Sequence, residues 1–142
     1  MKAFLRLVFF IIVLISIPSL TNAMWAKLSD TELVEQSDAI ITAELIGQTQ
    51  MTIKQSKMFI GVLEVEEVLK GDKNQTVILL TLPSSKGPHK SDDIFYKIGQ
   101  KGLWFLREQK AEGEAGLYLA DQPQRFVPEK HAAAQVEIIK NI

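Results

Sequence analysis

The stretch that decides the predicted fold is Phe59-Ile60-Gly61-Val62-Leu63-Glu64-Val65-Glu66-Glu67-Val68-Leu69-Lys70-Gly71. Side chains alternate between the two faces of a β-strand, so Phe59, Leu63 and Val65 are predicted to share the core-facing side. Gly61 lies within this face, which favours a sharp bend or a close backbone approach. The stretch is therefore interpreted as a long, bent strand with one apolar face.

The alternation changes near the end of this strand. Glu67 falls where an apolar residue is expected, and Val68 has the opposite parity. One inserted residue near Glu66 and Glu67, a β-bulge, would return Val68 to the core. A strand that is long, bent and bulged favours a small closed β-barrel, and an ordinary strand of a β-sandwich is the alternative.

Outward from this strand, the pattern predicts a mainly β protein with five strands. Ser29 and Glu32 form a capping-box pattern, which predicts a short N-terminal helix from Asp30 to Gln36. The C-terminal residues 129–142 favour a helix after Pro128, with a strand at 136–139 as the alternative. The other predicted strands are residues 39–46, 76–82, 103–106 and 117–120, with a hairpin connection at 55–57. An extension of the first strand through Met51 and Ile53, after an irregular patch, is the alternative for its end.

The N-terminus has the three-part pattern of a secretory signal peptide. Lys2 and Arg6 precede an apolar run of 11 residues, and small and polar residues follow it up to Ala23. The run is shorter than the ~20 residues of a membrane-spanning helix, although an uncleaved anchor is the alternative. The sequence thus predicts a signal peptide over residues 1–23, cleavage between Ala23 and Met24, and one exported domain over residues 24–142.

Composition narrows the classes of function. Without residues 1–23 the chain keeps 14 basic and 17 acidic residues, a formal charge of −3, which disfavours binding to nucleic acid. The chain contains no cysteine, which excludes thiol chemistry, disulfides and thiolate metal sites. We therefore predict a periplasmic or secreted protein without a stable membrane span after cleavage, and its expected partner is another envelope protein.

Three short motifs carry a resemblance to a known family: Ser37-Asp38-Ala39, Val68-Leu69-Lys70-Gly71 and Gly99-Gln100-Lys101-Gly102. In this order they resemble exported bacterial proteins related to the netrin-like and tissue-inhibitor-of-metalloprotease superfamily. The resemblance implies a five-stranded OB-like barrel. The family's zinc clamp uses an N-terminal cysteine, which this chain lacks. The family's helix between strands three and four also has no clear counterpart in residues 83–98.

Candidate functional residues are few. The polar segment 83–93 predicts an exposed loop, and its His89 and Lys90 are candidate binding residues. Trp104 and Phe105 are adjacent in a strand, so one of them faces away from the main core. That residue either packs under the terminal helices or joins a binding patch, and Trp104 is the candidate.

No catalytic residue, metal ligand or cofactor motif is predicted. We therefore expect a non-catalytic exported interaction or ligand-binding module. The alternatives are a small hydrolase that uses His89, Asp92 and Asp93, or a structural accessory protein of the envelope. Single-strand nucleic-acid binders combine aromatic side chains with basic residues, and here Lys97, Lys101 and Arg107 lie near the aromatic pair in the sequence. Export and net charge argue against that function.

Overall fold

The computed structural model describes residues 26–83, 93–110 and 116–142. The predicted signal peptide, with its cleavage site at Ala23 and Met24, lies outside the described residues. The same holds for His89, Lys90 and Asp92 in the predicted loop.

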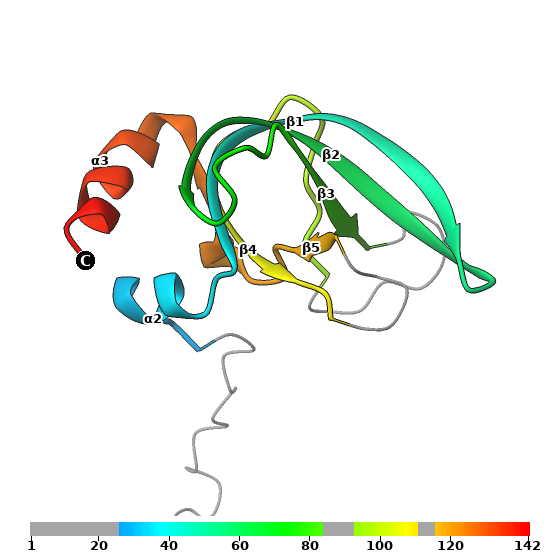
Figure 1. Cartoon of the computed structure of the whole chain (residues 1–142), viewed down its shortest axis with the longest axis horizontal. Helices are drawn as coiled ribbons and strands as arrows, with labels where there is room; N and C mark the ends of the chain where they lie inside the picture. The colour runs from blue at the N-terminus through cyan, green and yellow to red at the C-terminus, as the bar shows by residue number, and fades with distance from the viewer. Residues whose placement is uncertain (1–25, 84–92, 111–115) are drawn as a thin grey trace, which may run out of the picture.

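Five strands close into a ring (Figure 1). They follow one another in the order β1-β2-β3-β5-β4, and β4 pairs with β1 to complete the circuit. The mainly β prediction, with a short helix near the N-terminus and a C-terminal helix, is confirmed. The strands are β1 (Ala39–Ile53), β2 (Ser56–Lys70), β3 (Val77–Leu82), β4 (Lys101–Glu108), β5 (Leu117–Leu119) and β6 (Phe126–Pro128), and the helices are α2 (Asp30–Glu35), α3 (Glu129–Lys140) and the 3-10 turn Pro123–Arg125.

The predicted bulge lies in β2. Thr42 of β1 pairs with Glu67, and the next residue, Ala43, pairs with Val65, so Glu66 has no partner of its own. Val68 returns to the core as predicted and is 9% exposed. The extra residue restores the match between the apolar side chains and the inner face of the ring.

The first strand of the hairpin is continuous. It was expected over residues 39–46, with an extension through Met51 and Ile53 after an irregular patch as the alternative, and β1 runs without interruption to Ile53. Its turn consists of Lys54 and Gln55, both with positive φ, of 48° and 65°, as a two-residue hairpin turn requires. Ser56, which was predicted to belong to the connection, is already part of β2.

The other strand ends also differ from the prediction. β4 extends beyond the predicted residues 103–106 at both ends, because it pairs with β1, β5 and β6. β6 was not predicted, since its three residues become a strand only by pairing along β4.

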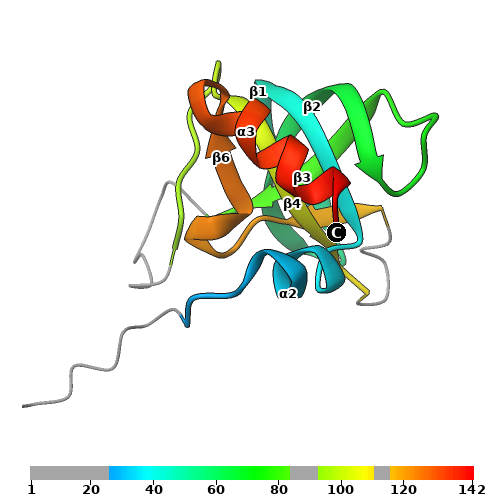
Figure 2. The same ribbon diagram turned by 90° about the vertical axis from the view of Figure 1, so that its left-hand side faces the viewer.

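The apolar side chains form two cores. The first lies inside the ring, and the second lies between the outside of the ring and the two helices, which cover the same side (Figure 2). Neighbouring residues of β4 face opposite cores, so Trp104 belongs to the first and Phe105 to the second. Both are 0% exposed. The buried residues of the ring core are Ala39, Ile41, Ala43, Leu45, Leu63, Val68, Ile78, Leu80, Trp104, Leu106 and Ala120.

Local signals explain the two helices. The capping box is present: Ser29 Oγ accepts from the backbone of Glu32 at 3.2 Å, and the Glu32 carboxylate accepts from the backbone of Ser29 at 2.8 Å. α3 begins after Pro128 and buries Ala132, Val136 and Ile139. This settles the open alternative for residues 136–139, which are helical. No helix among the described residues is long and apolar enough to cross a bilayer.

Candidate functional site

A hollow of about 200 Å³ opens beside the ring core. We call it the Phe95 pocket. Two of its lining residues, Leu82 and Tyr96, also pack against the ring core, so the pocket continues the apolar interior outward. Its lining residues are Gln48, Phe59, Leu82, Pro83, Phe95 and Tyr96.

The long hairpin supplies one wall of the pocket. In β1 the register shifts between Leu45, which pairs with Leu63, and Gly47, which pairs with Val62. Ile46 is thus a second bulge, and Gln48, opposite Gly61, turns toward the pocket.

Gly61 gives room to two leucines, of which Leu82 lines the pocket. A Cβ atom on Gly61 would lie 2.8 Å from Leu45 Cδ1 and 3.2 Å from Leu82 Cδ1. The absence of a side chain therefore allows both leucines to pack against the backbone of β2. This is the close approach that the glycine within the strand predicts.

The segment before β4 supplies the opposite wall. Its backbone is attached to β1, because Gly99 donates to the Leu45 carbonyl at 2.7 Å and Leu45 donates to the Gln100 carbonyl at 2.9 Å. Further along, Gln48 Nε2 donates to the Tyr96 carbonyl at 3.1 Å. These bonds fix the backbone that presents Phe95.

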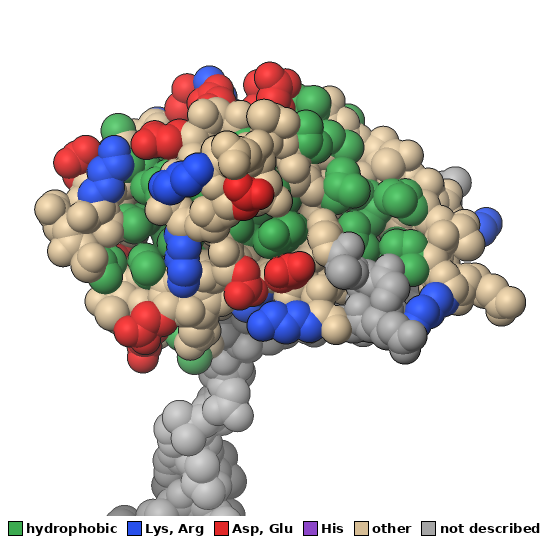
Figure 3. Space-filling view, in the orientation of Figure 1, with side chains coloured by type: hydrophobic (Ala, Val, Ile, Leu, Met, Phe, Trp, Pro, Cys, Tyr) green, Lys and Arg blue, Asp and Glu red, His purple; other side chains and the backbone are tan. Residues whose placement is uncertain are grey.

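Tyr96 and Phe95 point in different directions. The Tyr96 hydroxyl donates to the Ala120 carbonyl at 2.8 Å, and its ring meets Trp104 and Phe126 edge-on at 4.9 and 5.8 Å. Phe95 remains 51% exposed. An exposed phenylalanine beside an apolar hollow is typical of a contact surface. Figure 3 shows hydrophobic side chains gathered on the side of the molecule where β2 and β3 lie.

One ionisable side chain is found among the lining residues that the structure describes. It is Tyr96, whose pKa is raised above the usual value of 10.0 by burial and by the nearby charge of Asp121. Arg125 acts in the opposite direction, more weakly. The phenol thus stays protonated at neutral pH and already donates its hydrogen bond. Among the described residues no group of three acidic, histidine or cysteine side chains is placed to hold a metal ion.

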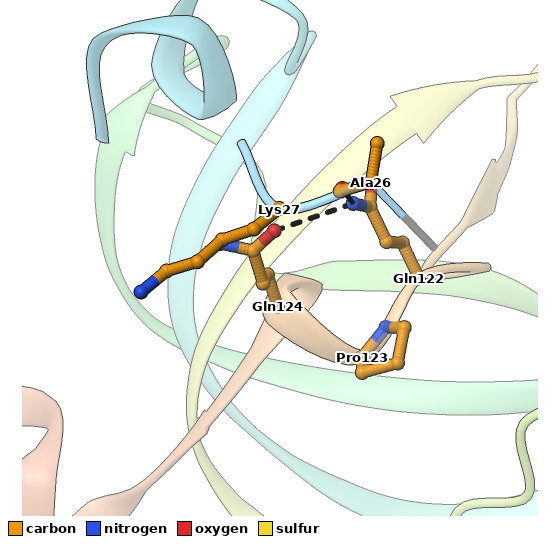
Figure 4. A pocket seen from close by; sticks show the side chains of 5 residues that line it. All are labelled: Ala26, Lys27, Gln122, Pro123 and Gln124. Carbon is orange, nitrogen blue, oxygen red and sulfur yellow. Dashed lines mark hydrogen bonds between the residues drawn. The ribbon is translucent and has the colours of Figure 1, made fainter. Parts of the chain in front are cut away.

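A second hollow, of about 180 Å³, lies at the start of the described chain (Figure 4). Gln124 binds both backbone groups of Leu28: its Oε1 accepts from the Leu28 amide at 2.8 Å, and its Nε2 donates to the Leu28 carbonyl at 2.9 Å. Gln122 Nε2 donates to the Ala26 carbonyl at 3.1 Å. The chain's own N-terminal segment uses these amides, so the hollow is the weaker candidate for a ligand site.

A buried arginine holds the 3-10 turn Pro123–Arg125 against the core. Arg125 is 2% exposed and donates from Nη1 to Ser37 Oγ and to the Phe105 carbonyl, both at 3.2 Å. Its Nε has no hydrogen-bond partner among the described residues and lies 3.9 Å from Asp121 Oδ1. Burial, together with the charge of Arg107, lowers the pKa of Arg125. Sequence analysis did not single out this residue, because nothing local distinguishes a buried arginine from an exposed one.

The predicted site residues have different outcomes. Trp104 lies inside the ring, where its Nε1 donates to the Ala43 carbonyl at 3.0 Å, so it is not available at the surface. Phe105 packs under the helices, which is one of the two expected roles for the outward member of the pair. The described ends of the predicted loop lie near the Phe95 pocket: Pro83 lines it, and Asp93, the last residue of the loop, is two residues before Phe95 in the sequence.

Two basic residues considered for nucleic-acid binding are engaged in ion pairs. Lys101 Nζ lies 2.8 Å from Glu66 Oε1, and this contact together with Glu129 raises the pKa of Lys101. Arg107 lies 2.5 Å from Asp121.

Sequence reasoning did not identify the residues of the Phe95 pocket as a site. Phe59 was assigned to the core face, and Phe95 was not singled out. One signal for the pocket was available in the sequence: the apolar face of β2 continues as far as Phe59. Phe59 pairs with Gln50, outside the part of β1 that pairs with β4.

No protein-family profile matches the chain, and no curated protein matches it significantly. The functional argument therefore depends on the chemistry of the site.

Proposed function

We propose that the protein is a non-catalytic binding module that holds an uncharged apolar or aromatic group of a partner in the Phe95 pocket. The observation that carries this proposal is the lining that the structure describes: aromatic and aliphatic side chains, one amide and one protonated phenol. A lining of this kind favours desolvated apolar groups, and its described residues include no base or nucleophile for a reaction.

The size of the pocket indicates the size of the bound group. Small-molecule sites usually enclose about 300–1,000 Å³, whereas this pocket measures about 200 Å³. It suits one bulky side chain better than a cofactor. A single buried aromatic anchor is a common centre of protein–protein contacts.

Localisation belongs to the same proposal. The N-terminal pattern of residues 1–23 supports export, with another envelope protein as the partner. The relationship to the netrin-like superfamily stays a prediction, since no comparison tests it.

An NMR titration of the mature chain, residues 24–142, tests the proposed site. N-acetylphenylalanine amide serves as an uncharged model of a partner side chain. We expect saturable shifts of the Gln48 side-chain amide and of the Phe95 and Tyr96 backbone amides, with α3 unaffected. An affinity in the millimolar range is expected for so small a ligand.

Two exposed apolar residues give a matched pair of variants. Phe95→Ser removes a wall of the pocket, whereas Ile138→Ser changes a residue of similar exposure, 46% against 51%, on α3. We expect about tenfold weaker binding in the first variant and unchanged binding in the second. Equal affinities in both variants, or no saturable shift in the unmodified protein, would remove this site.

A further inference from the structure

Among the described residues, nothing pairs with one edge of β1 in the far half of the hairpin. β4 runs along β1 only from Ala39 to Glu44, and Leu45 is bonded to Gly99 and Gln100. From residue 47 to residue 53, β1 pairs with β2 alone within the part of the chain that the structure describes. Figure 1 shows this hairpin projecting beyond the other strands.

The open edge lacks the usual protection against pairing. Natural edge strands are commonly short or carry proline or charged residues, which prevent another strand from adding. Residues 47–53 read Gly-Gln-Thr-Gln-Met-Thr-Ile, without proline and without charge. Backbone groups exposed along such an edge can bind an extended segment by strand addition.

The open edge and the Phe95 pocket share Gln48. Gln48 lines the pocket and belongs to the open part of β1. Gln50 lies on the same face, opposite Phe59, because side chains two residues apart share a face and cross-strand partners lie side by side. A strand added beside residues 48–52 would therefore present alternate side chains next to the pocket.

We propose that this edge accepts an extended segment of a partner protein as an additional strand, and that the segment places an uncharged apolar side chain in the Phe95 pocket. This inference rests on the proposed function and adds the form of the partner: an uncharged segment with alternating polar and apolar residues. Gly99 and Gln100 already bond to the backbone of Leu45 on this edge of β1. The added segment would bond to the same edge further along the strand.

A second copy of the chain is a poorer occupant. Two copies paired along this edge would bring Gln48, Gln50 and Thr52 to the pocket face. These side chains are polar and would leave the apolar lining unfilled. The pocket therefore favours a different sequence.

The probe is the capped nonapeptide Ser-Thr-Val-Thr-Phe-Thr-Val-Thr-Ser, compared with N-acetylphenylalanine amide by NMR titration of the mature chain. Successive residues of a strand point their N–H groups to opposite edges, so each edge of the peptide can be blocked separately by N-methylation of alternate residues. Both probes present the same aromatic side chain to the pocket.

We expect the peptide to bind at least about tenfold more tightly than the amide, as a few net hydrogen bonds imply. One N-methylated series should lose this higher affinity, and the other should keep it. Binding of the peptide should also slow amide exchange at residues 47–53. A peptide no tighter than the amide, or two N-methylated series that both match the parent, would overturn strand addition and leave the pocket intact.

Two other outcomes separate the inference from its premise. If neither probe binds, the pocket and the edge both fail. If the protein dimerises without peptide and thereby protects residues 47–53, a second copy is the occupant and the proposed partner segment is wrong.

Discussion

Among the described glycines, Gly102 is the one where an added Cβ atom would meet another atom at the shortest distance. It lies opposite Pro128, and a Cβ atom there would lie 2.0 Å from the carbonyl oxygen of Val127. Because backbone atoms cannot move aside like the end of a side chain, Gly102→Ala must displace β6 from β4. We expect the free energy of unfolding to fall by about 1–3 kcal/mol or more, measured by urea denaturation.

Gly47→Ala is the control for this variant. An added Cβ there meets nothing within 4 Å, and the glycine is not among those with positive φ. Its effect should stay within about 0.5 kcal/mol. Equal losses for the two variants would contradict the close approach.

The raised pKa of Tyr96 predicts how stability changes at alkaline pH. Its pKa is raised in the folded protein, so the unfolded chain releases the phenolic proton first, near pH 10.0. The contribution of Tyr96 to the free energy of unfolding is therefore fully present below about pH 9 and is lost as the pH rises above about 10.

Tyr96→Phe isolates this contribution. The variant lacks the hydrogen bond to Ala120, so its free energy of unfolding at neutral pH should be about 0.5–1.5 kcal/mol lower than that of the unmodified protein. Between about pH 9 and 11 the free energy of unfolding of the variant should fall less steeply than that of the unmodified protein. Denaturant melts of both proteins across this range measure the difference. Identical slopes would show that the phenol is not buried.

At the scale of elements, Gln124 controls the attachment of the N-terminal segment. It binds both backbone groups of Leu28, whereas Gln122 binds only the carbonyl of Ala26. We expect Gln124→Ala to speed amide exchange at Leu28 clearly more than Gln122→Ala does. Exchange at Ile41 in β1 serves as the reference, and equal acceleration at Ile41 would mean general destabilisation instead.

Elements specified by neighbouring residues were predictable from sequence. The capping box of Ser29 and Glu32 and the bulge at Glu66 each depend on a few consecutive positions. The hairpin turn at Lys54 and Gln55 was displaced in the prediction, because neither residue is the glycine or asparagine that usually marks positive φ. β6 could not be predicted, since its strand conformation depends on its position along β4.

The proposed binding site belongs to the scale of the whole molecule. Its walls come from β1, β2, the end of β3 and the segment before β4, which only the closed ring brings together. Alternation correctly assigned Leu63 to the inside and Glu64 to the outside. It could not show that Trp104 and Phe105 each face a core, because the second core depends on the covering helices.

The uncharged lining leads to a prediction about pH dependence. None of the lining residues that the structure describes titrates near neutrality, so the affinity for N-acetylphenylalanine amide should stay constant from about pH 5 to 9. Titrations at several pH values measure this directly. A bell-shaped dependence would instead indicate ionisable groups in the site, as an enzyme would require.

The central claim is that an uncharged side chain enters the Phe95 pocket, and intermolecular nuclear Overhauser effects test it most directly. With ¹³C-labelled protein and unlabelled N-acetylphenylalanine amide, we predict contacts from the ligand ring to Phe59, Leu82 and Phe95, and none to Ile138 on α3. Ligand contacts confined to Ala26, Pro123 and Gln124 at the second hollow, or spread evenly over exposed apolar residues, would contradict the claim.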